Sequence, residues 1–313
     1  MKTKLQKLFN LSSDYRGVVR FNEPMAEHTS LGLGGAVDVY AVPEDLGSLR
    51  FILKVAYDNG MPIFPVGHGT NLLIKDGGIR GIVLSLKSFN RLEVLESHEQ
   101  ETVYLAVGAG VALGRLIQFT VQHGYAGLEG LAGIPGTVGG GVFMNAGSFG
   151  AEIGDCVVSV DVLEKDGFRR NLDAKDLNFS YRSSCIPEGA IVIEAVFRFK
   201  QDESSNVKGR VKECLERKKS TQPLGFSSAG CVFKNINGNA AGRLLDLAGC
   251  KGMKIGGAEI STVHANFIIN HGDRAEDFLA LMEKARERVK MLFDVELKPE
   301  IQIIGEDRME VFD

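Results

Sequence analysis

Hydrophobic residues in the first 200 positions fall mainly into short runs, with two stretches of helical spacing among them. Runs at 37–42 and 63–66 predict strands, and apolar spacing of about 3.6 residues over 46–59 predicts a helix between them. Further strands are expected at 81–86, 92–95, 103–107, 157–163, 168–172 and 191–200, and a second amphipathic helix at 113–123. We interpret the last three of these strands as a meander.

The pattern changes after the polar stretch QDESSNV at 201–207, which predicts a domain boundary. Beyond it, helices are expected at 207–218, 240–248 and about 275–292, and strands at 231–233, 258–260, 267–270 and close to the C-terminus. Asp273 and Glu276 predict a capping box for the last helix. We therefore expect an α+β protein with a first domain at 1–200, itself two subdomains at about 20–90 and 91–200, a second domain at 207–305 and a tail at 306–313.

Composition favours a small-molecule ligand. The 313 residues are 44% hydrophobic and carry a net charge of −4 without a dense basic cluster, which argues against nucleic acid and anionic membrane as partners. The first residues lack the apolar core of a signal peptide, and no run is long enough for a membrane span, so we expect a cytoplasmic protein. Five widely spaced cysteines suggest free thiols in a reducing compartment and no metal site.

Two glycine-rich segments carry the strongest chemical signal, GHGTNLL at 67–73 and the long stretch at 127–150. Glycine lets main-chain N–H groups approach a ligand and form a concave anion site, so the pair predicts a pyrophosphate-bearing cofactor. Asn71 and Asn145 add amide groups, although a strained surface loop would also be glycine-rich. Leu72 stands where a nicotinamide fingerprint needs its third glycine, and no Gly-Lys pair exists for a P-loop.

Ten ordered motifs between Asn22 and Gly305 carry a family resemblance. They are NEP at 22–24, HTS at 28–30, GG at 34–35, GHGTNL at 67–72, GIPG at 133–136, NAG at 145–147, YRSS at 181–184, AGCVFKN at 229–235, HAN at 264–266 and PE at 299–300. With them the chain resembles the UDP-N-acetylenolpyruvoylglucosamine reductase family. The short stretch between Arg182 and Ile191 resembles the subtype that lacks an extra tyrosine-bearing loop.

The resemblance implies a fold and a reaction. The expected fold is a two-subdomain FAD-binding domain of the vanillyl-alcohol-oxidase-like (PCMH-type) class, followed by a C-terminal α+β substrate domain. The expected reaction is NADPH-dependent, FAD-mediated reduction of UDP-N-acetylglucosamine enolpyruvate to UDP-N-acetylmuramate for the bacterial cell wall. NADPH and substrate would use the same site in turn, with non-covalent FAD and a monomeric enzyme.

The resemblance also implies site residues. FAD would be held by Gly67, His68, Gly69, Thr70, Asn71, Leu72, Gly133, Ile134, Gly136, Gly140, Asn145 and Gly147. The substrate would be bound by Tyr181, Lys234, Asn235 and Glu259, and the implied catalytic residues are Arg182, Cys231 and Glu300. A guanidinium at 182 suits the negative charge that hydride addition develops on the enolpyruvyl carboxylate.

Cys231 is a departure, because the family usually has serine there. A thiol has an ordinary pKa of about 8.5, so it is mostly protonated at neutral pH and is a reasonable proton donor. The alternative interpretation of Cys231 is a buried structural cysteine, and Arg182 and Glu300 taken alone are more often surface charges.

Other positions leave alternatives open. Leu31-Gly32 and Ile236 also depart from the family pattern, and the first departure would loosen a contact to FAD. The cluster Arg217-Lys218-Lys219 suits either phosphate binding or the negative end of a helix dipole. Two rival functions are an FAD-dependent oxidase on the same scaffold and a nucleotide-sugar sensor that needs no flavin.

Overall fold

The computed structural model describes residues 9, 14–96, 99–236 and 238–307. It divides into two compact units, each assembled from distant parts of the chain. Unit 1 comprises Met1–Phe21, Val39–Gly67 and Gly81–Arg217, and unit 2 comprises Asn22–Asp38, His68–Arg80 and Lys218–Asp313. The chain passes from one unit to the other for the last time inside α5 (Ser204–Thr221), beyond the polar stretch at 201–207. Residues 308–313 of the expected tail lie outside the described residues.

The first sheet has the strand order β1-β2-β5-β3. Its strands are β1 (Gly17–Pro24), β2 (Ala36–Pro43), β5 (Ile79–Ser85) and β3 (Ile63–Val66). The predicted helix is α2 (Leu46–Asp58), which begins where the Asp45 carboxylate accepts a hydrogen bond from the Ser48 amide at 2.7 Å. The strand and helix predictions for 37–86 are thus confirmed, whereas β1 was missed.

The second sheet belongs to unit 1 and has the order β12-β11-β13-β7-β6. Its strands are β6 (Leu92–Leu95), β7 (Thr102–Gly108), β11 (Val157–Leu163), β12 (Arg169–Asp173) and β13 (Ile191–Gln201), and β8 (Tyr125–Ala126) pairs with β13. The strand positions agree with the sequence prediction, but the meander is wrong. Strand β11 lies between β12 and β13, and β13 pairs on its other side with β7.

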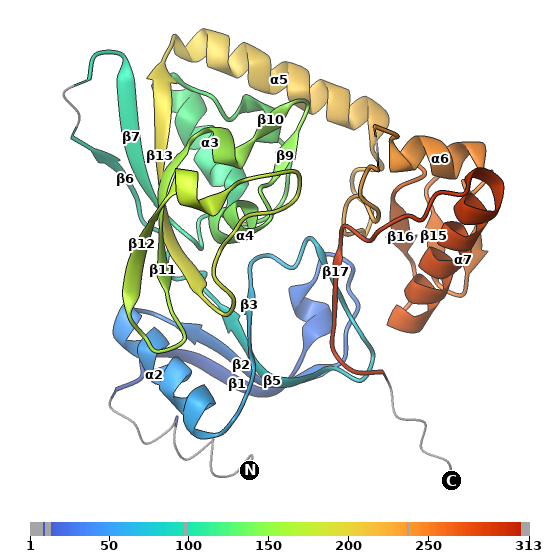
Figure 1. Cartoon of the computed structure of the whole chain (residues 1–313), viewed down its shortest axis with the longest axis horizontal. Helices are drawn as coiled ribbons and strands as arrows, with labels where there is room; N and C mark the ends of the chain where they lie inside the picture. Colours follow the sequence, from blue (N-terminus) through green and yellow to red (C-terminus); the bar gives the residue numbers. More distant parts are fainter. Residues whose placement is uncertain (1–8, 10–13, 97–98, 237, 308–313) are drawn as a thin grey trace. The chain divides into compact units, whose positions relative to one another are not determined.

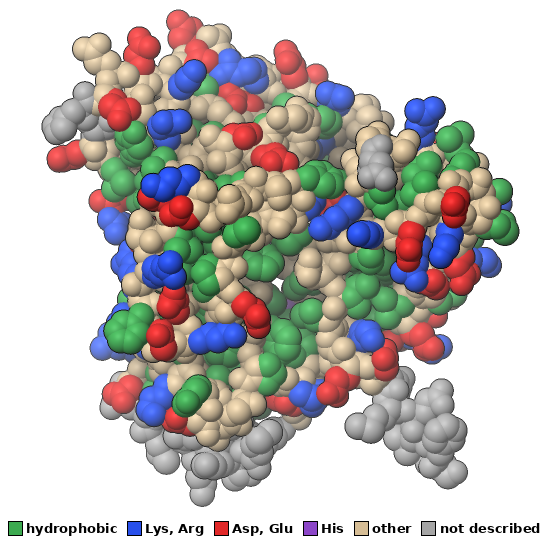
Figure 2. Space-filling view, in the orientation of Figure 1, with side chains coloured by type: hydrophobic (Ala, Val, Ile, Leu, Met, Phe, Trp, Pro, Cys, Tyr) green, Lys and Arg blue, Asp and Glu red, His purple; other side chains and the backbone are tan. Residues whose placement is uncertain are grey.

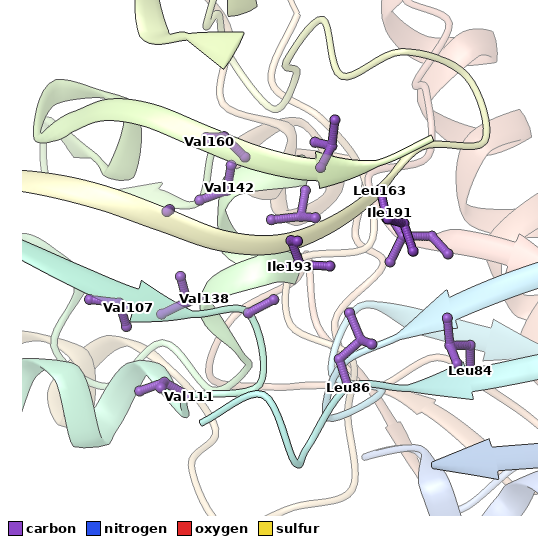
Figure 3. Close-up of a cluster of buried hydrophobic side chains, with 14 of the residues drawn as sticks. Leu84, Leu86, Val107, Val111, Val138, Val142, Val160, Leu163, Ile191 and Ile193 are labelled. Carbon is purple, nitrogen blue, oxygen red and sulfur yellow. The ribbon is translucent and has the colours of Figure 1, made fainter. Parts of the chain in front are cut away.

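The second glycine-rich segment is not a plain loop. It contains a short helix, α4 (Val138–Phe143), together with η2 (Glu129–Leu131), β9 (Gly147–Ser148) and β10 (Ala151–Glu152). Figure 3 shows Val138 and Val142 of α4 among buried side chains from the second sheet, including Val107, Val160 and Ile193. Burial of these apolar side chains anchors the segment, while Gly133, Gly140 and Gly150 stay exposed.

Unit 1 also contains helices outside these sheets. They are α3 (Leu113–His123), which matches its prediction, the 3-10 helices η3 (Ile153–Asp155) and η4 (Ala174–Leu177), and most of α5. Among the described residues, no helix combines the length and the apolar character that a membrane crossing requires. Figure 2 shows acidic and basic side chains interspersed over the face in view.

Unit 2 has a three-stranded sheet of order β14-β15-β16. Its elements are η1 (Met25–His28), β4 (Leu72–Ile74), α6 (Ala241–Leu247), β14 (Lys254–Ile255), β15 (Ala258–Ile260), β16 (Ile268–Asn270), α7 (Ala275–Phe293) and β17 (Gln302–Ile304), with α6, α7, β15 and β16 labelled in Figure 1. Helix α7 packs on β14 and β15, and its side chains Phe278, Leu281 and Ala285 are fully buried. The strand predicted at 231–233 is wrong: Cys231 and Phe233 form isolated bridges, and the Asn266 side chain bonds both backbone groups of Phe233.

The cap of α7 differs from the prediction. The Asp76 carboxylate, from the turn after β4, accepts hydrogen bonds from the amides of Ala275 at 2.8 Å and Glu276 at 3.2 Å. The N-cap residue is Arg274, without a capping bond from its own side chain. The capping box of Asp273 and Glu276 is therefore wrong, because a carboxylate distant in sequence satisfies the first amides of the helix.

We expect Asp76→Ala to destabilise unit 2 and Asp273→Ala to have little effect. Loss of a helix cap costs about 1 kcal/mol, and the Asp76 carboxylate also opposes the positive end of the helix dipole. Urea unfolding followed by circular dichroism should show a lower midpoint for Asp76→Ala, with Asp273→Ala at the wild-type midpoint as the matched control. Equal midpoints for the two variants would contradict the assigned cap.

Candidate functional site

The two glycine-rich segments meet in unit 1 at Gly67. This residue directly follows β3, and a Cβ atom placed on it would lie 2.5 Å from the Oγ1 atom of Thr137. A larger residue at 67 would displace the Thr137 side chain, so glycine suits this approach of the first turn to the second segment. Thr137 in turn caps α4 by accepting a hydrogen bond from the Gly140 amide at 3.4 Å. The fold thus places the turn at Gly67 against the residues predicted to hold the same cofactor.

The second segment contributes open main chain at some positions and not at others. Gly133 and Gly140 are exposed, and Gly133 has a φ of 77°. The amides of Val138 and Gly139 donate instead to the carbonyls of Val111 and Ala109, each at 2.8 Å. These two amides are therefore already engaged within the protein. Ile134 and Gly136 lie half-buried in the same segment.

Tyr181 and Arg182 occupy the two central positions of a tight turn in unit 1. Ser180 and Ser183 close the turn by exchanging two backbone hydrogen bonds of 3.0 Å. Arg182 has a φ of 55°, in the left-handed region that a non-glycine residue adopts at a cost of about 1–2 kcal/mol. Its Nη2 atom donates to the Gly147 carbonyl at 2.9 Å, and its guanidinium lies 5.0 Å from the centre of the Tyr181 ring. Arg182 is thus tied to the predicted cofactor segment.

Asn145 was predicted to contact the cofactor, but its side chain is engaged within the protein. The residue is fully buried, and its Nδ2 atom donates to the Glu152 carboxylate at 2.5 Å and to the Ser180 carbonyl at 2.9 Å. Its Oδ1 atom accepts from the Gly154 amide at 3.1 Å. The side chain links its own segment to β10, to η3 and to the turn that begins at Ser180.

In unit 2, residues His68–Leu72 run beside the segment that carries Glu300. Gly69 has a φ of 64°, and a Cβ atom there would lie 2.0 Å from the His28 carbonyl oxygen, so glycine is required. The Asn71 side chain donates to the Glu300 carbonyl at 3.3 Å, and the Asn71 carbonyl accepts from the Gln302 amide at 2.9 Å. Parallel pairing of β4 with β17 continues this contact, with Thr70 half-buried just before β4.

The segment of Cys231 lies beside that of Glu300. The Glu300 amide donates to the Val232 carbonyl at 2.7 Å, and Phe233 bridges to Pro299. Glu300 is 9% exposed, which excludes the reading of a solvated surface acid, and Cys231 is half-buried. Unit 2 therefore brings a thiol and a buried carboxyl group onto adjacent segments.

Asn266 was quoted in a sequence motif without a role, and the structure supplies one. Its Oδ1 atom accepts from the Phe233 amide at 2.9 Å, its Nδ2 atom donates to the Phe233 carbonyl at 2.8 Å, and its own carbonyl accepts from the Val232 amide. The Asn266 amide donates to Nδ1 of His264 at 3.2 Å, and burial lowers the pKa of His264. His264, which is neutral, and the buried Asn266 hold the backbone next to Cys231. The sequence signal for this role was a polar residue within a conspicuous motif.

The remaining predicted residues have identifiable partners. The Asn235 Oδ1 atom accepts from the Ala241 amide at 3.0 Å at the start of α6, and the Lys234 amide donates to the Lys298 carbonyl at 2.8 Å. Glu259, on β15, pairs with Lys254 at 3.1 Å and His271 at 3.3 Å, and the hydrogen bond from Lys254 lowers the pKa of Glu259.

The basic cluster at the end of α5 is split by environment. Lys218 is 2% exposed, Lys219 is exposed, and Arg217 lies over the Phe149 ring at 4.4 Å in unit 1. Lys218 and Lys219 both stand in the last turn of the helix, as the dipole interpretation expects. Leu31, one of the departures, is fully buried in the core of unit 2.

Comparisons with known proteins match this arrangement over nearly the whole chain. Residues 37–173 match the FAD binding domain family, and residues 222–304 match the family described as UDP-N-acetylenolpyruvoylglucosamine reductase, C-terminal domain. The two matches confirm the expected FAD-binding part and family-specific C-terminal part.

Individual relatives agree with the family matches. The reductase of that name from Geobacter sulfurreducens is 41% identical over 301 residues, covering 95% of this chain and 97% of the relative, and that from Clostridium tetani is 39% identical over 293 residues, covering 93% and 94%. The crystal structure of the Thermus caldophilus reductase superposes with a TM-score of 0.78 at 33% identity, covering 93% of this chain and all of that one. This chain belongs to the UDP-N-acetylenolpyruvoylglucosamine reductase family.

Proposed function

We propose that this protein reduces UDP-N-acetylglucosamine enolpyruvate to UDP-N-acetylmuramate with NADPH as hydride donor and FAD as the bound cofactor. The observation that carries the proposal is the pairing of the Cys231 and Glu300 segments, which supplies a proton donor and a buried carboxyl group together. Family membership over nearly the whole chain supports the same reaction.

The residues of both glycine segments fit a flavin dinucleotide. In unit 1, exposed main chain at Gly67, Gly133 and Gly140 offers a surface without side chains for a diphosphate. In unit 2, taken by itself, the family resemblance assigns to FAD the backbone of His68 to Leu72 with the Thr70 and Asn71 side chains. The chemistry supplied by bound FAD would be hydride transfer, with NADPH as the donor and the methylene carbon of the substrate as the acceptor.

Arg182 would stabilise the charge that this addition creates. Hydride addition to the methylene carbon moves electron density onto the neighbouring carbon and its carboxylate, so the intermediate is an enol-type dianion. A guanidinium donates two parallel hydrogen bonds to a carboxylate and is always protonated near neutral pH. The tight turn and the bond to Gly147 restrict where this guanidinium can lie.

Cys231 would then deliver a proton to that neighbouring carbon, which completes the addition of one hydride and one proton. The Sγ–H bond breaks, a C–H bond forms, and the thiolate regains a proton from solvent before the next turnover. Glu300 would act beside it as a charged or hydrogen-bonding group, while Asn235 and Lys234 would bind the UDP-sugar and Tyr181 would line the substrate next to Arg182. Glu259, held by Lys254 and His271, is proposed as a weaker contact.

The test is anaerobic stopped-flow spectroscopy. The purified protein should carry a flavin spectrum, bleach with NADPH, and regain oxidised absorbance rapidly when UDP-N-acetylglucosamine enolpyruvate is added. A reduced protein that stays bleached with this sugar but reoxidises rapidly in air would replace the proposal with the oxidase function. A protein without flavin that cannot be reconstituted with FAD would sink both.

Glu300→Gln should lower turnover by about 100-fold while the affinity for the UDP-sugar changes little, since the charge of a carboxyl group beside the proton donor contributes mainly to the transition state. Steady-state kinetics and titration of the oxidised enzyme with substrate would separate the two effects. Glu296→Gln, an exposed acid four residues earlier, is the matched control. Full activity of Glu300→Gln would remove Glu300 from the mechanism.

We also infer that the enzyme works as a cytoplasmic monomer. The monomer is what the family resemblance leads us to expect, and none of the five cysteines forms a disulfide, as is usual in a reducing compartment.

A further inference from the structure

Asn145 has the bonding pattern of a positioning residue. It is fully buried, has a φ of 44°, and uses its amide to link the Glu152 carboxylate, the Ser180 carbonyl and the Gly154 amide. Both donor and acceptor atoms of the side chain are thus occupied by the protein. A buried amide with these partners is costly to remove, because each partner would lose its hydrogen bond away from water.

The Ser180 carbonyl is the link to the catalytic turn. Ser180 precedes Tyr181, and its backbone exchanges hydrogen bonds of 3.0 Å with Ser183 across the turn that carries Arg182. The positive φ of Arg182 makes this turn intrinsically unfavourable for a non-glycine residue, so contacts outside the turn must hold it. The bond from Asn145 is such a contact.

The Arg182 side chain is also hydrogen-bonded to the short segment 145–152. Its Nη2 atom donates to the carbonyl of Gly147, two residues after Asn145, and Gly147 pairs with Glu152 between β9 and β10. Glu152 in turn accepts the Asn145 amide, and a bond to a carboxylate is stronger than one between neutral groups. Backbone and guanidinium of Arg182 are therefore both positioned against residues 145–152.

We propose that Asn145 is a positioning residue for Arg182 and that Glu152 orients the Asn145 amide, in place of a direct side-chain contact from Asn145 to the cofactor. The proposal rests on the proposed function, in which Arg182 stabilises the developing carboxylate charge. It assigns to Asn145 an effect on hydride transfer to the sugar and little effect on reduction by NADPH.

The experiment compares Asn145→Gly with a matched control, Asn178→Gly. Asn178 also has a left-handed φ, 41°, and stands two residues before Ser180, but it is exposed and its side chain bonds only at 3.4 Å to Asp176. Glycine accepts both conformations, so the two variants differ mainly in the bonds removed. A second test combines Asn145→Asp with Glu152→Gln, which reverses the donor and the acceptor between residues 145 and 152. The double variant keeps the acceptor for the Gly154 amide but removes the donor to the Ser180 carbonyl.

Two readouts are measured on the flavin-loaded proteins. Hydrogen–deuterium exchange at the Ser183 amide should accelerate by about 10-fold or more in both Asn145 variants and stay unchanged in Asn178→Gly. Reoxidation of NADPH-reduced enzyme by the enolpyruvyl sugar should slow by about 10–100-fold, since a displacement of about 1 Å in a positioned group has that effect, with reduction by NADPH within about 2-fold of wild type. In the Arg182→Gly background, Asn145→Gly should add less than about 2-fold, because residues acting as a unit are non-additive.

Several outcomes would overturn the assignment. Multiplicative effects of Asn145→Gly and Arg182→Gly, equal slowing of both half-reactions, or unchanged Ser183 exchange would each refute a positioning role. If the Asn145 variants reoxidise at the wild-type rate while Arg182→Gly reoxidises slowly, the positioning role is refuted and the catalytic role of Arg182 stands. Wild-type reoxidation in Arg182→Gly refutes the catalytic role of Arg182 and the positioning role with it. If Asn145→Gly fails to fold, the Asp/Gln pair provides the same comparisons.

Discussion

Arg182→Gly should slow reoxidation of the reduced enzyme by the enolpyruvyl sugar by about 100–1,000-fold, the range found when a donor to a developing oxyanion is removed. Its thermal stability should stay near that of the wild type. Glycine adopts the φ of 55° without the cost that arginine bears, and this offsets the lost bond to Gly147. Stopped-flow spectroscopy and thermal unfolding followed by circular dichroism measure the two effects.

Arg182→Lys separates charge from shape. Lysine keeps the positive charge but has no planar fork, so we expect reoxidation between that of the wild type and that of Arg182→Gly. Arg170 is an exposed arginine on the edge strand β12 and pairs with Glu164. The control variant Arg170→Ala should react as the wild type does. Rapid reoxidation in Arg182→Gly would exclude Arg182 from charge stabilisation.

Cys231→Ala should reduce product formation by about 100–10,000-fold, the usual contribution of a general acid. Hydride transfer should persist, because Arg182 still stabilises the anion that forms, so the flavin colour should return before the product appears. Rapid chemical quench combined with stopped-flow absorbance would resolve the two events. Cys231→Ser restores a hydroxyl donor at the same position, and we expect substantial turnover from it.

The control for Cys231 is Cys214→Ala, another half-buried free thiol, which should leave both events unchanged. Cys250, also in unit 2, is a second comparison, because its thiol is buried and that burial raises its pKa. Product formation at the wild-type rate in Cys231→Ala would assign the proton to another group and leave Cys231 a structural cysteine.

Local pattern accounts for most of the secondary structure. The ranges predicted for α3 and β11 coincide with those observed, and α2, β7, β13 and α7 differ by only one or two residues at their ends. These elements have clear periods of apolar residues, and burying one face is what stabilises them. The glycine turn at 67–72 could also be predicted from the sequence. Glycine has no Cβ atom, so its tolerance of close backbone contacts is a property of the residue type.

The order of strands within a sheet and the hydrogen-bond partners of polar groups could not be predicted in the same way. The position of β11 between β12 and β13 depends on which edges are available after the chain collapses. The division into units cuts between Gly67 and His68 inside a single motif. Local sequence patterns cannot predict such a division, because each compact unit is formed by contacts between segments that are distant in the sequence.

The sequence by itself determined the element types, the two glycine segments, the ordered motifs and, through them, the family. Tertiary structure decided which groups those motifs serve: Asp76 caps a helix 199 residues away, Asn266 holds Phe233 across 33 residues, and Asn145 reaches Ser180 across 35. A residue's donors and acceptors follow from its type, but their partners follow from burial. A polar group that loses water must bond whatever the fold places beside it, and that neighbour is known only when the chain has folded.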